Sequence, residues 1–564
     1  MPISARVFSK PLTLCDRVAG RGVNAVSSTL AVVFCITLAF PPHAKSCYGQ
    51  ELESANPDAK VMQVLSVGEA LESEGNWGEA IRHYETASRD FPNNRSIYRR
   101  LIISRIHGDV ERRYGDRSFV TESSRMSGSQ ALDLYSEILS NLETHYVESM
   151  DWPRILLHGT AALEIALTEP KFLERQLAGA DIEAIERFRQ TIHQRIVERP
   201  ATTPSELRAN VAFVANTAHR EIGLQPTAVI LEYLSGAVST LDPYTRLLSK
   251  DQLDEMFSNI KGNFVGLGVE LETQSDALRI LSVIPGGPAD EAGIKAGERI
   301  VRVEATHTAS DDPEIAADLL RGPEGSLVSI SVASIDAEIR DLSIRRRRVD
   351  IPCVENVHLV DQSARIGYLR LTNFQETTTR EMERALWDLH RQGMRALVLD
   401  VRGNPGGLLS AAVEVADRFL AQGRIVTTRG RNSRENFDYV AHRANTWDIP
   451  LAVLVDNDSA SASEIFAGAI SDSRRGVLVG TKTFGKGSVQ GIFRMQSAPF
   501  GLCLTTAKFY SPAGKAISQN GVEPHYNEQS KYIAARPQED GRLTLDNEDS
   551  VIQRAILALR GTIR

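Results

Sequence analysis

The feature that most constrains the fold is a pair of short apolar runs in the C-terminal half of the chain, Ala396 to Val401 and Leu451 to Val455. Such runs are typical of strands in a parallel sheet that is covered on both faces. Each run is followed by a turn and then by a helical pattern, Leu408 to Leu420 after the first and Ser461 to Ile470 after the second. We therefore expect an α/β layer, with functional groups at the carboxyl ends of its strands.

Ser461 lies where the second of these strands ends and a helix begins. The string Ser461-Ala-Ser-Glu464 fits a capping box, so one interpretation is that Ser461 only caps the helix. A serine at a helix N-terminus also meets backbone N–H donors and a favourable dipole for a developing oxyanion. The pattern alone leaves a structural and a nucleophilic role open.

Lys486 stands between Gly485 and Gly487, in surroundings of mostly small or apolar residues. Burial lowers the pKa of a lysine, and a desolvated lysine can take the proton of a serine hydroxyl. We therefore predict that Lys486 is a general base, the alternative being a surface lysine in a glycine turn. Gln490 could orient the amine by accepting a hydrogen bond through its side-chain carbonyl.

The turn Arg402-Gly-Asn-Pro-Gly-Gly407 follows the first buried strand. Glycine lets backbone N–H groups approach a reacting carbonyl closely, so this turn is a candidate source of oxyanion donors.

Between Phe264 and Arg345 the sequence changes to short strand-like runs with glycine and proline turns. The string Gly-Gly-Pro-Ala…Ala-Gly-Ile…Ala-Gly-Glu298 resembles a PDZ domain of the bacterial protease type. Such a domain adds a peptide as an extra strand and holds its terminal carboxylate with backbone N–H groups. Here those donors would be Gly266, Leu267 and Gly268. We interpret the basic run Arg345 to Arg348 as a solvated strand edge.

From Val61 to Tyr233 the pattern is helical. Gly68 to Asn94 resembles one tetratricopeptide repeat, although a helical hairpin packed on its neighbours explains it equally well. The leader has a basic segment, an apolar run from Ala25 to Phe40 and small residues near Ala44. We predict a signal peptide and export to the periplasm or the cell exterior, with an uncleaved membrane anchor as the alternative.

Composition excludes several classes of function. The formal net charge of -8 gives no reason to expect nucleic acid or an anionic membrane surface as a partner. The five cysteines show no metal-ligand spacing, and two of them lie in the leader. We expect no metal and no cofactor.

Five strings together resemble the carboxy-terminal processing (tail-specific) proteases. They are Leu241-Asp-Pro-Tyr-Thr245, Asp400-Val-Arg-Gly-Asn-Pro-Gly-Gly-Leu408, Ser459-Ala-Ser-Ala-Ser-Glu-Ile-Phe-Ala-Gly468, Thr483-Phe-Gly-Lys-Gly-Ser-Val-Gln490 and Ser511-Pro-Ala-Gly-Lys515. The resemblance covers about Leu234 to Pro524. It implies a serine endopeptidase with a crotonase-like α/β core, to which a PDZ domain delivers the C-terminus of a substrate.

Carried over by position, the resemblance implies that Ser461 is the nucleophile, Lys486 the general base and Gln490 its orienting partner. The N–H groups of Ala462 and Gly407 would form the oxyanion hole, and Asp472 matches a polar position of some members. The sequence departs from the family at His525, where Asp is usual, and at Tyr244-Thr245, where His-Ser is usual. We expect these departures to lie away from the dyad.

The predicted fold is multidomain: an α-helical N-terminal region, a PDZ-like β-rich domain and a crotonase-like α/β core. The predicted function is that of an exported endopeptidase acting on proteins with free C-termini, and the helical region could bind an adaptor. The alternatives are a secreted peptide-binding scaffold with an inactive core, and a Ser/His/Asp hydrolase, which the missing Gly-x-Ser-x-Gly elbow disfavours. The predicted segments are a signal peptide (1–46), a tetratricopeptide-like part (47–125), a helical part (126–258), the PDZ domain (259–348), the peptidase core (349–530) and a tail with a short helix (531–564).

Overall fold

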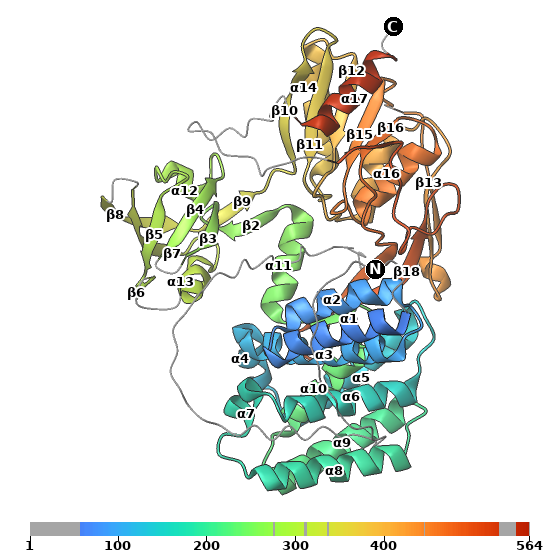
Figure 1. Ribbon diagram of the computed structural model, residues 1–564. Coiled ribbons are helices and arrows are strands. Elements are labelled where there is room, and N and C mark those ends of the chain that lie inside the picture. Colours follow the sequence, from blue (N-terminus) through green and yellow to red (C-terminus); the bar gives the residue numbers. More distant parts are fainter. Residues whose placement is uncertain are drawn as a thin grey trace, which may run out of the picture. The chain divides into compact units, whose positions relative to one another are not determined.

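A computed structural model describes residues 57–274, 277–308, 313–334, 338–444, 446–529 and 549–562 (Figure 1). The described residues divide into two compact units, with the boundary between Gly108 and Asp109. The predicted signal peptide lies outside the described residues. Within those residues, none of the helices is both long and apolar enough to cross a bilayer.

The first unit is helical, as predicted. It contains α1 (Pro57–Ser73), α2 (Trp77–Asp90) and most of α3 (Arg95–Gly115). Its core includes Ala80, Tyr84 and Leu101. A Cβ at Gly68 would collide with the ring of Tyr84, so this glycine lets α1 and α2 pack closely. The segment predicted to resemble a tetratricopeptide repeat is therefore a helical hairpin, and its capacity to bind a peptide stays a prediction.

A second set of helices precedes the PDZ-like region in the chain. Among them α10 is buried along nearly its whole length and packs mainly on α6 and α9. The set is α4 (Arg117–Arg125), α5 (Gly128–His145), α6 (Trp152–Ala166), α7 (Pro170–Gln176), α8 (Ile182–Glu198), α9 (Pro204–Ile222), α10 (Pro226–Ser239) and α11 (Lys250–Lys261).

The PDZ-like region forms an antiparallel sheet in the order β3-β4-β5-β7-β8, with β6 paired to β5. Leu278, Ile280, Ile300 and Val328 lie in its core. In the described residues β3 pairs only with β4, so it is an edge strand. The elements are β3 (Val269–Thr273), β4 (Leu278–Val283), α12 (Pro288–Glu291), β5 (Arg299–Val303), β6 (Thr306–His307), α13 (Pro313–Leu320), β7 (Leu327–Ala333) and β8 (Ile339–Arg345), while β2 (Asn263–Gly266) and β9 (Arg347–Asp350) form a separate ribbon.

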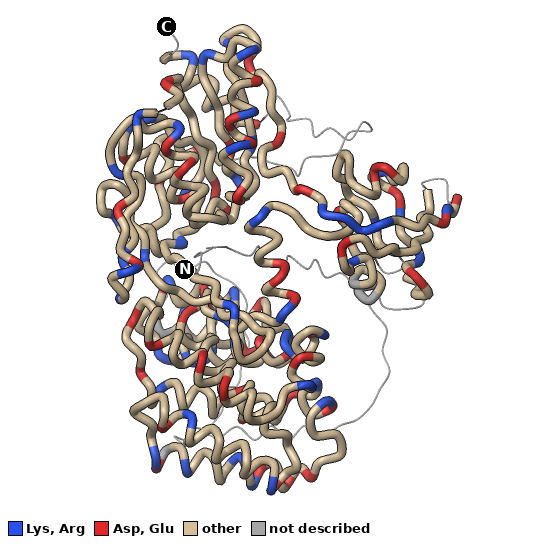
Figure 2. The backbone as a smooth tube through the Cα atoms, turned by 180° about the vertical axis from the view of Figure 1, so that it is seen from behind, with Lys and Arg blue, Asp and Glu red and all other residues tan. Residues whose placement is uncertain are grey.

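The arginine run at the junction of β8 and β9 belongs to a blue stretch of the tube in Figure 2, and it differs in part from the prediction of a solvated strand edge. Arg345, Arg347 and Arg348 are exposed, but Arg346 is 7% exposed. Its guanidinium donates to the backbone carbonyls of Leu319, Leu320 and Leu327. Arg346 is thus a structural link between α13 and the start of β7, and the interpretation was wrong for this one residue.

The α/β core is a six-stranded sheet in the order β10-β11-β12-β15-β16-β19. The strands from β11 to β19 run parallel, and β10 is antiparallel at one edge. One set of strand side chains packs with α17, and the alternate set packs with α14, α15 and α16. The sheet is therefore covered on both faces, as the apolar runs predict. Its elements are β10 (Val354–Asp361), β11 (Ile366–Leu371), α14 (Thr378–Arg391), β12 (Ala396–Asp400), α15 (Leu409–Asp417), β15 (Leu451–Val455), α16 (Ala462–Asp472), β16 (Val477–Gly480), β19 (Tyr526–Asn527) and α17 (Ser550–Arg560).

A second sheet of the core was not predicted. Its order is β1-β18-β13-β14, and β17 also pairs with β18. Strand β17 begins directly after the segment that carries Lys486, so this sheet positions the predicted base. The strands are β1 (Arg246–Leu248), β13 (Arg424–Arg429), β14 (Phe437–Val440), β17 (Ser488–Arg494) and β18 (Gly501–Tyr510), with a 3-10 turn, η1, at Ser433–Glu435.

The three-part architecture predicted from the sequence is thus confirmed.

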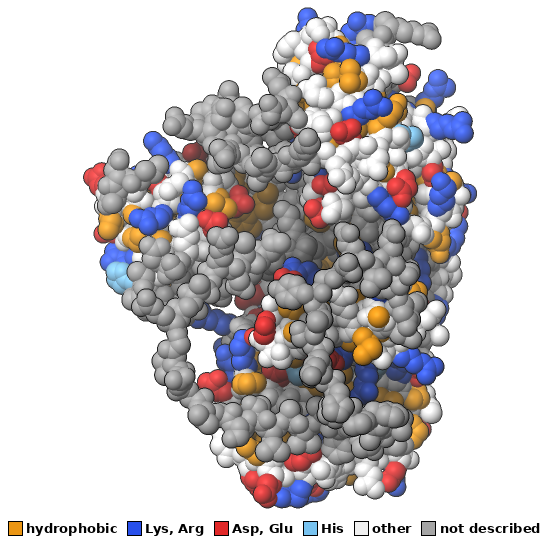
Figure 3. Space-filling model, viewed as in Figure 1, with side chains coloured by type: hydrophobic (Ala, Val, Ile, Leu, Met, Phe, Trp, Pro, Cys, Tyr) orange, Lys and Arg blue, Asp and Glu red, His pale blue; other side chains and the backbone are white. Residues whose placement is uncertain are grey.

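Side chains of both charges are interspersed over the described part of the face in Figure 3, and no large patch of one sign stands out there.

Candidate active site

Ser461 occupies a sharp bend between β15 and α16. Its backbone has φ 57° and ψ −108°, a conformation that costs a non-glycine residue energy. The residue is 1% exposed. Polar bonds hold the bend: the Ser463 hydroxyl donates to the Asn404 carbonyl (2.9 Å), and the Ala460 N–H donates to the same carbonyl (3.1 Å). The bend therefore resembles a nucleophile elbow, although it has no flanking glycines.

The carboxylate of Glu464 joins the serine segment to the lysine segment. Its Oε2 accepts from the backbone N–H of Ser461 and from that of Lys486, each at 2.8 Å. Its Oε1 accepts from the Thr483 hydroxyl (2.6 Å) and the Gly485 N–H (2.7 Å). Because both N–H groups bind the same oxygen, Oε2, the backbone nitrogens of Ser461 and Lys486 lie no farther apart than twice 2.8 Å. The capping-box glutamate is present as predicted, and it does more than cap a helix.

Lys486 is a half-buried residue whose amine is largely removed from water. Removal from water lowers the pKa of Lys486 to about 7, and the nearby Arg246 acts in the same direction. Cys503, Asp242 and Glu464 oppose this by favouring the ammonium form. An amine with this pKa is substantially uncharged at neutral pH, which a general base requires.

Gln490 lies next to Ser461 but does not make the predicted contact. Its Nε2 donates to the hydroxyls of Ser488 (2.9 Å) and Thr505 (3.4 Å). Its Oε1 is buried and has no hydrogen-bond partner among the described residues. The expected hydrogen bond from Lys486 to this oxygen is therefore not made, and an unused acceptor is left inside the site.

Ser461 and Gln490 line one small cavity of about 10 Å³, which holds no more than one water molecule. The other lining residues are Leu409, Ile465, Ser488, Val489 and Phe509. A peptide needs far more room than this, so the walls of the cavity must separate before a substrate can reach Ser461.

The glycine turn lies against the serine. A Cβ at Gly406 would be 3.0 Å from the Cβ of Ser461 and 3.0 Å from the N of Ala462. Gly406 and Gly407 have φ values of 109° and 138°, which favour glycine. The Phe374 N–H donates to the Gly406 carbonyl, and the Leu408 N–H donates to the Phe374 carbonyl. Neither bond uses the Gly407 N–H. The N–H of Ala462 is the first of α16 and has no intrahelical acceptor.

The predicted peptide-binding turn, Gly266-Leu-Gly268, lies between β2 and β3. Gly268 has φ 79°, and Leu267 is buried in the core of the PDZ-like sheet. The carbonyls of Leu267 and Gly268 accept from Ala289 and Ile284, so the turn is fixed through its acceptors. It leads directly into the edge strand β3.

Asp472 lies at the opposite end of α16 from Ser461. Its carboxylate accepts from the N–H of Ala513 (2.9 Å) and lies 4.0 Å from the Lys515 amine. Asp472 therefore holds the Ser511–Lys515 turn, and its contacts are structural.

One expectation about the departures from the family is wrong. His525 lies at a strand edge, where its ring accepts from the Leu478 N–H at 2.9 Å. Tyr244, in contrast, does not lie away from the predicted dyad: the amine of Lys486 is 4.4 Å from the centroid of its ring. The sequence offered no signal for this contact, because the two residues are far apart along the chain.

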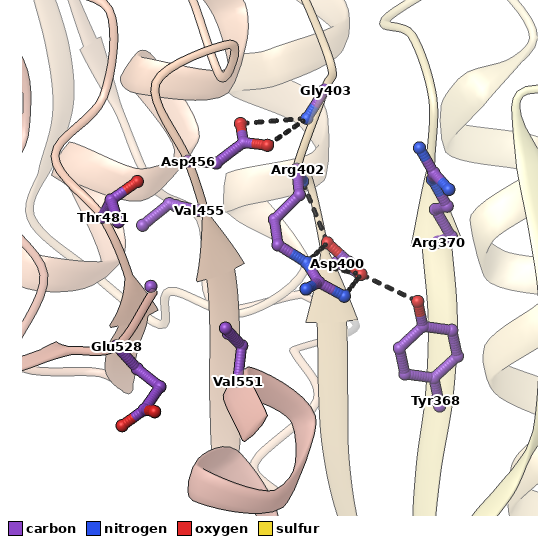
Figure 4. A pocket seen from close by; sticks show the side chains of 11 residues that line it. Tyr368, Arg370, Asp400, Arg402, Gly403, Val455, Asp456, Thr481, Glu528 and Val551 are labelled. Atoms are coloured by element: carbon purple, nitrogen blue, oxygen red, sulfur yellow. Dashed lines mark hydrogen bonds and ion pairs between the residues drawn. The ribbon is translucent and has the colours of Figure 1, made fainter. Parts of the chain in front are cut away.

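A larger cavity of about 200 Å³ opens at the carboxyl ends of β11, β12, β15 and β16 (Figure 4). In it the Arg402 guanidinium pairs with Asp400 and, at 2.8 Å, with Asp549 at the start of α17. The Asp456 carboxylate accepts from the Gly403 N–H. These contacts tie the glycine turn to α17 and to the loop before Ser461, and the cavity borders both loops.

Two families match parts of this chain. Peptidase family S41 matches residues 365–528, and the PDZ domain matches residues 279–334. A carboxy-terminal-processing protease of Bartonella bacilliformis is 35% identical over 302 residues, which is 52% of this chain and 67% of the relative. The chloroplastic carboxyl-terminal-processing peptidase 3 of Arabidopsis thaliana is 31% identical over 445 residues, which is 73% of this chain and 84% of the relative.

Among solved structures, a photosystem II D1 C-terminal processing protease is 28% identical, with 67% of this chain and 94% of that chain covered and a TM-score of 0.33. The two sequence relatives exceed 30% identity over two thirds or more of their own length. This chain therefore belongs to the carboxyl-terminal-processing proteases of peptidase family S41 and contains a PDZ domain.

Proposed function

We propose that this chain is an exported serine endopeptidase in which Ser461 is the nucleophile and Lys486 the general base. The observation that carries the proposal is the Glu464 carboxylate, which binds the backbone N–H groups of both residues. The second support is the buried lysine amine, whose pKa is lowered to about 7 by loss of water. A serine needs such a neighbour to become nucleophilic.

The proposed reaction has two stages. The uncharged amine of Lys486 takes the proton of the Ser461 hydroxyl while Oγ attacks the scissile carbonyl. The N–H groups of Gly407 and Ala462 stabilise the oxyanion, and the ammonium then gives its proton to the departing amine. In the second stage water attacks the acyl group on Ser461 in the same way, with Lys486 again carrying the proton, and the acyl group is released. Gln490 would orient the amine through its unused Oε1 once the cavity has opened.

Substrate choice in this proposal falls to the PDZ domain. The edge strand β3 has a free side for an added peptide strand among the described residues. The N–H groups of Gly266, Leu267 and Gly268 would hold the carboxylate of a protein C-terminus. Export rests on the basic and apolar leader alone, and N-terminal sequencing of protein from the expected compartment tests it.

The decisive experiment incubates the full chain with an unfolded test protein and identifies the products by mass spectrometry. Wild type should cleave, while Ser461→Ala and Lys486→Ala should be inactive and remain folded. The rate should rise as the pH rises through about 7, since an uncharged amine is the active form. No cleavage by wild type, or equal cleavage by Ser461→Ala, would instead support the peptide-binding scaffold.

A further inference from the structure

Tyr244 reaches Lys486 from a turn that is held rigidly. This turn joins α10 to β1, and the Asp242 carboxylate organises it. Oδ1 of Asp242 accepts from the N–H groups of Tyr244 (2.8 Å) and Thr245 (3.0 Å), and Oδ2 accepts from the Thr245 hydroxyl (2.6 Å). These bonds fix the backbone from which the Tyr244 side chain extends.

The turn is also fixed to the strand beside the active site. The Thr505 hydroxyl donates to Asp242 Oδ1 at 2.9 Å, and the Thr505 N–H donates to the Thr245 hydroxyl at 3.2 Å. The same Thr505 hydroxyl accepts from Nε2 of Gln490 at 3.4 Å. One turn therefore places the aromatic ring at the amine and is linked through Thr505 to the amide of Gln490.

The ring presents its face to the amine, with Nζ of Lys486 4.4 Å from the centroid of Tyr244. An aromatic face attracts a cation and attracts it more strongly where water is excluded. The other charged or titratable groups that act on this amine are Arg246, Cys503, Asp242 and Glu464. To these groups the ring of Tyr244 adds an aromatic face that attracts a cation.

We propose that Tyr244 is a positioning residue for Lys486, whose ring holds the amine in place and stabilises the ammonium that forms when the Ser461 proton is transferred. This inference rests on the proposed role of Lys486 as the base. The proton moves from Ser461 Oγ to Lys486 Nζ and then to the leaving amine, so the ring contributes while the charge is on the lysine. Its contribution ends when that proton departs.

The test compares Tyr244→Phe, which keeps the ring, with Tyr244→Leu and Tyr244→Met, which keep apolar bulk without it. Tyr98→Leu, at an exposed position of the first unit, is the matched control. Thermal melts identify any variant that fails to fold. The pH dependence of kcat/KM is measured for all variants from pH 5 to 9.

We expect Tyr244→Phe and Tyr98→Leu to match wild type. Tyr244→Leu and Tyr244→Met should shift the acid limb down by about 0.5 to 1 pH unit, because the ammonium loses its aromatic partner. Their plateau rate should fall by about 3- to 10-fold for the same reason. Superimposable profiles for all variants overturn the proposal, and an equal shift in Tyr244→Phe assigns the effect to the hydroxyl and overturns it as well.

A second measurement needs no activity. In the Ser461→Ala protein labelled with ¹³C-lysine, the Lys486 Cε resonance is titrated by NMR and assigned by its loss in Lys486→Met. Its midpoint should fall in Tyr244→Leu and stay unchanged in Tyr244→Phe. An unchanged midpoint in both rejects the role of Tyr244 even if wild type cleaves, whereas a shifted midpoint in an enzyme that never cleaves rejects only the proposed function.

Discussion

Replacing Lys486 by methionine should stabilise the protein, and the gain should depend strongly on pH. Burial lowers the pKa of Lys486 from 10.5 to about 7, so the folded state binds a proton less readily than the unfolded chain. Below pH 7 the fold must bury a charged amine. Methionine has similar length and no charge, so it removes this cost.

The magnitude follows from the two pKa values. At pH 6 the lysine is protonated in both states, and its burial costs about 5 kcal/mol relative to a side chain that is always neutral. At pH 9 it is neutral when folded but still charged when unfolded, and about 2 kcal/mol of the cost remains. The stabilisation by Lys486→Met should therefore be about 3 kcal/mol larger at pH 6 than at pH 9.

The assay is urea unfolding at pH 6, 7.5 and 9, with both proteins carrying Ser461→Ala to prevent self-cleavage. Replacing Trp77 and Trp152 by phenylalanine leaves Trp387 and Trp447, both in the core region, as the fluorescent reporters. Since each unfolding curve is compared with its partner at the same pH, other titrating groups cancel. A difference between the two proteins that stays constant from pH 6 to pH 9 would refute the lowered lysine pKa and, with it, the base.

Two further predictions concern the carboxylates of Glu464 and Asp549. Glu464→Gln should lower kcat/KM by about 100-fold, because an amide cannot accept from all four donors and the segments of Ser461 and Lys486 then shift apart. The control Glu523→Gln, at a side chain that is 70% exposed, should leave kcat/KM unchanged. Equal kcat/KM values for the two variants would contradict the anchoring role of Glu464. Asp549→Ala should lower the free energy of unfolding by roughly 2 to 3 kcal/mol, since the N-cap of α17 and a partner of Arg402 are both lost. Asp549→Asn should lose less free energy of unfolding, because asparagine keeps the N-cap. Equal losses for the two variants in denaturant unfolding would contradict this prediction.

Much of the core was predictable because burial leaves a local pattern. Leu451 to Val455 was predicted as a strand with the same bounds that the structure has. The run is apolar because α17 covers one face of its sheet and α14 to α16 cover the other. The helix after Ser461 was predictable for a similar reason, since its capping residues are adjacent in sequence.

The second sheet and the surroundings of Lys486 were not predictable in this way. Strand β18 buries Thr505 and Thr506 beside apolar residues, so it shows no clear alternation. The bond from Thr505 to Asp242 joins residues 263 positions apart. Similarly, nothing local distinguishes Arg346 from its exposed neighbours, because its acceptors are backbone carbonyls of other elements.

The shared Glu464 carboxylate has a consequence for how a substrate enters. Four hydrogen bonds converge on this one side chain, which is fully buried, so moving Ser461 away from Lys486 would break several of them together. Leu409 and Phe509 line the same cavity with apolar side chains, which can change rotamer without breaking a hydrogen bond. We therefore expect a substrate to enter by movement of the apolar wall residues, while Ser461 and Lys486 keep their positions relative to each other.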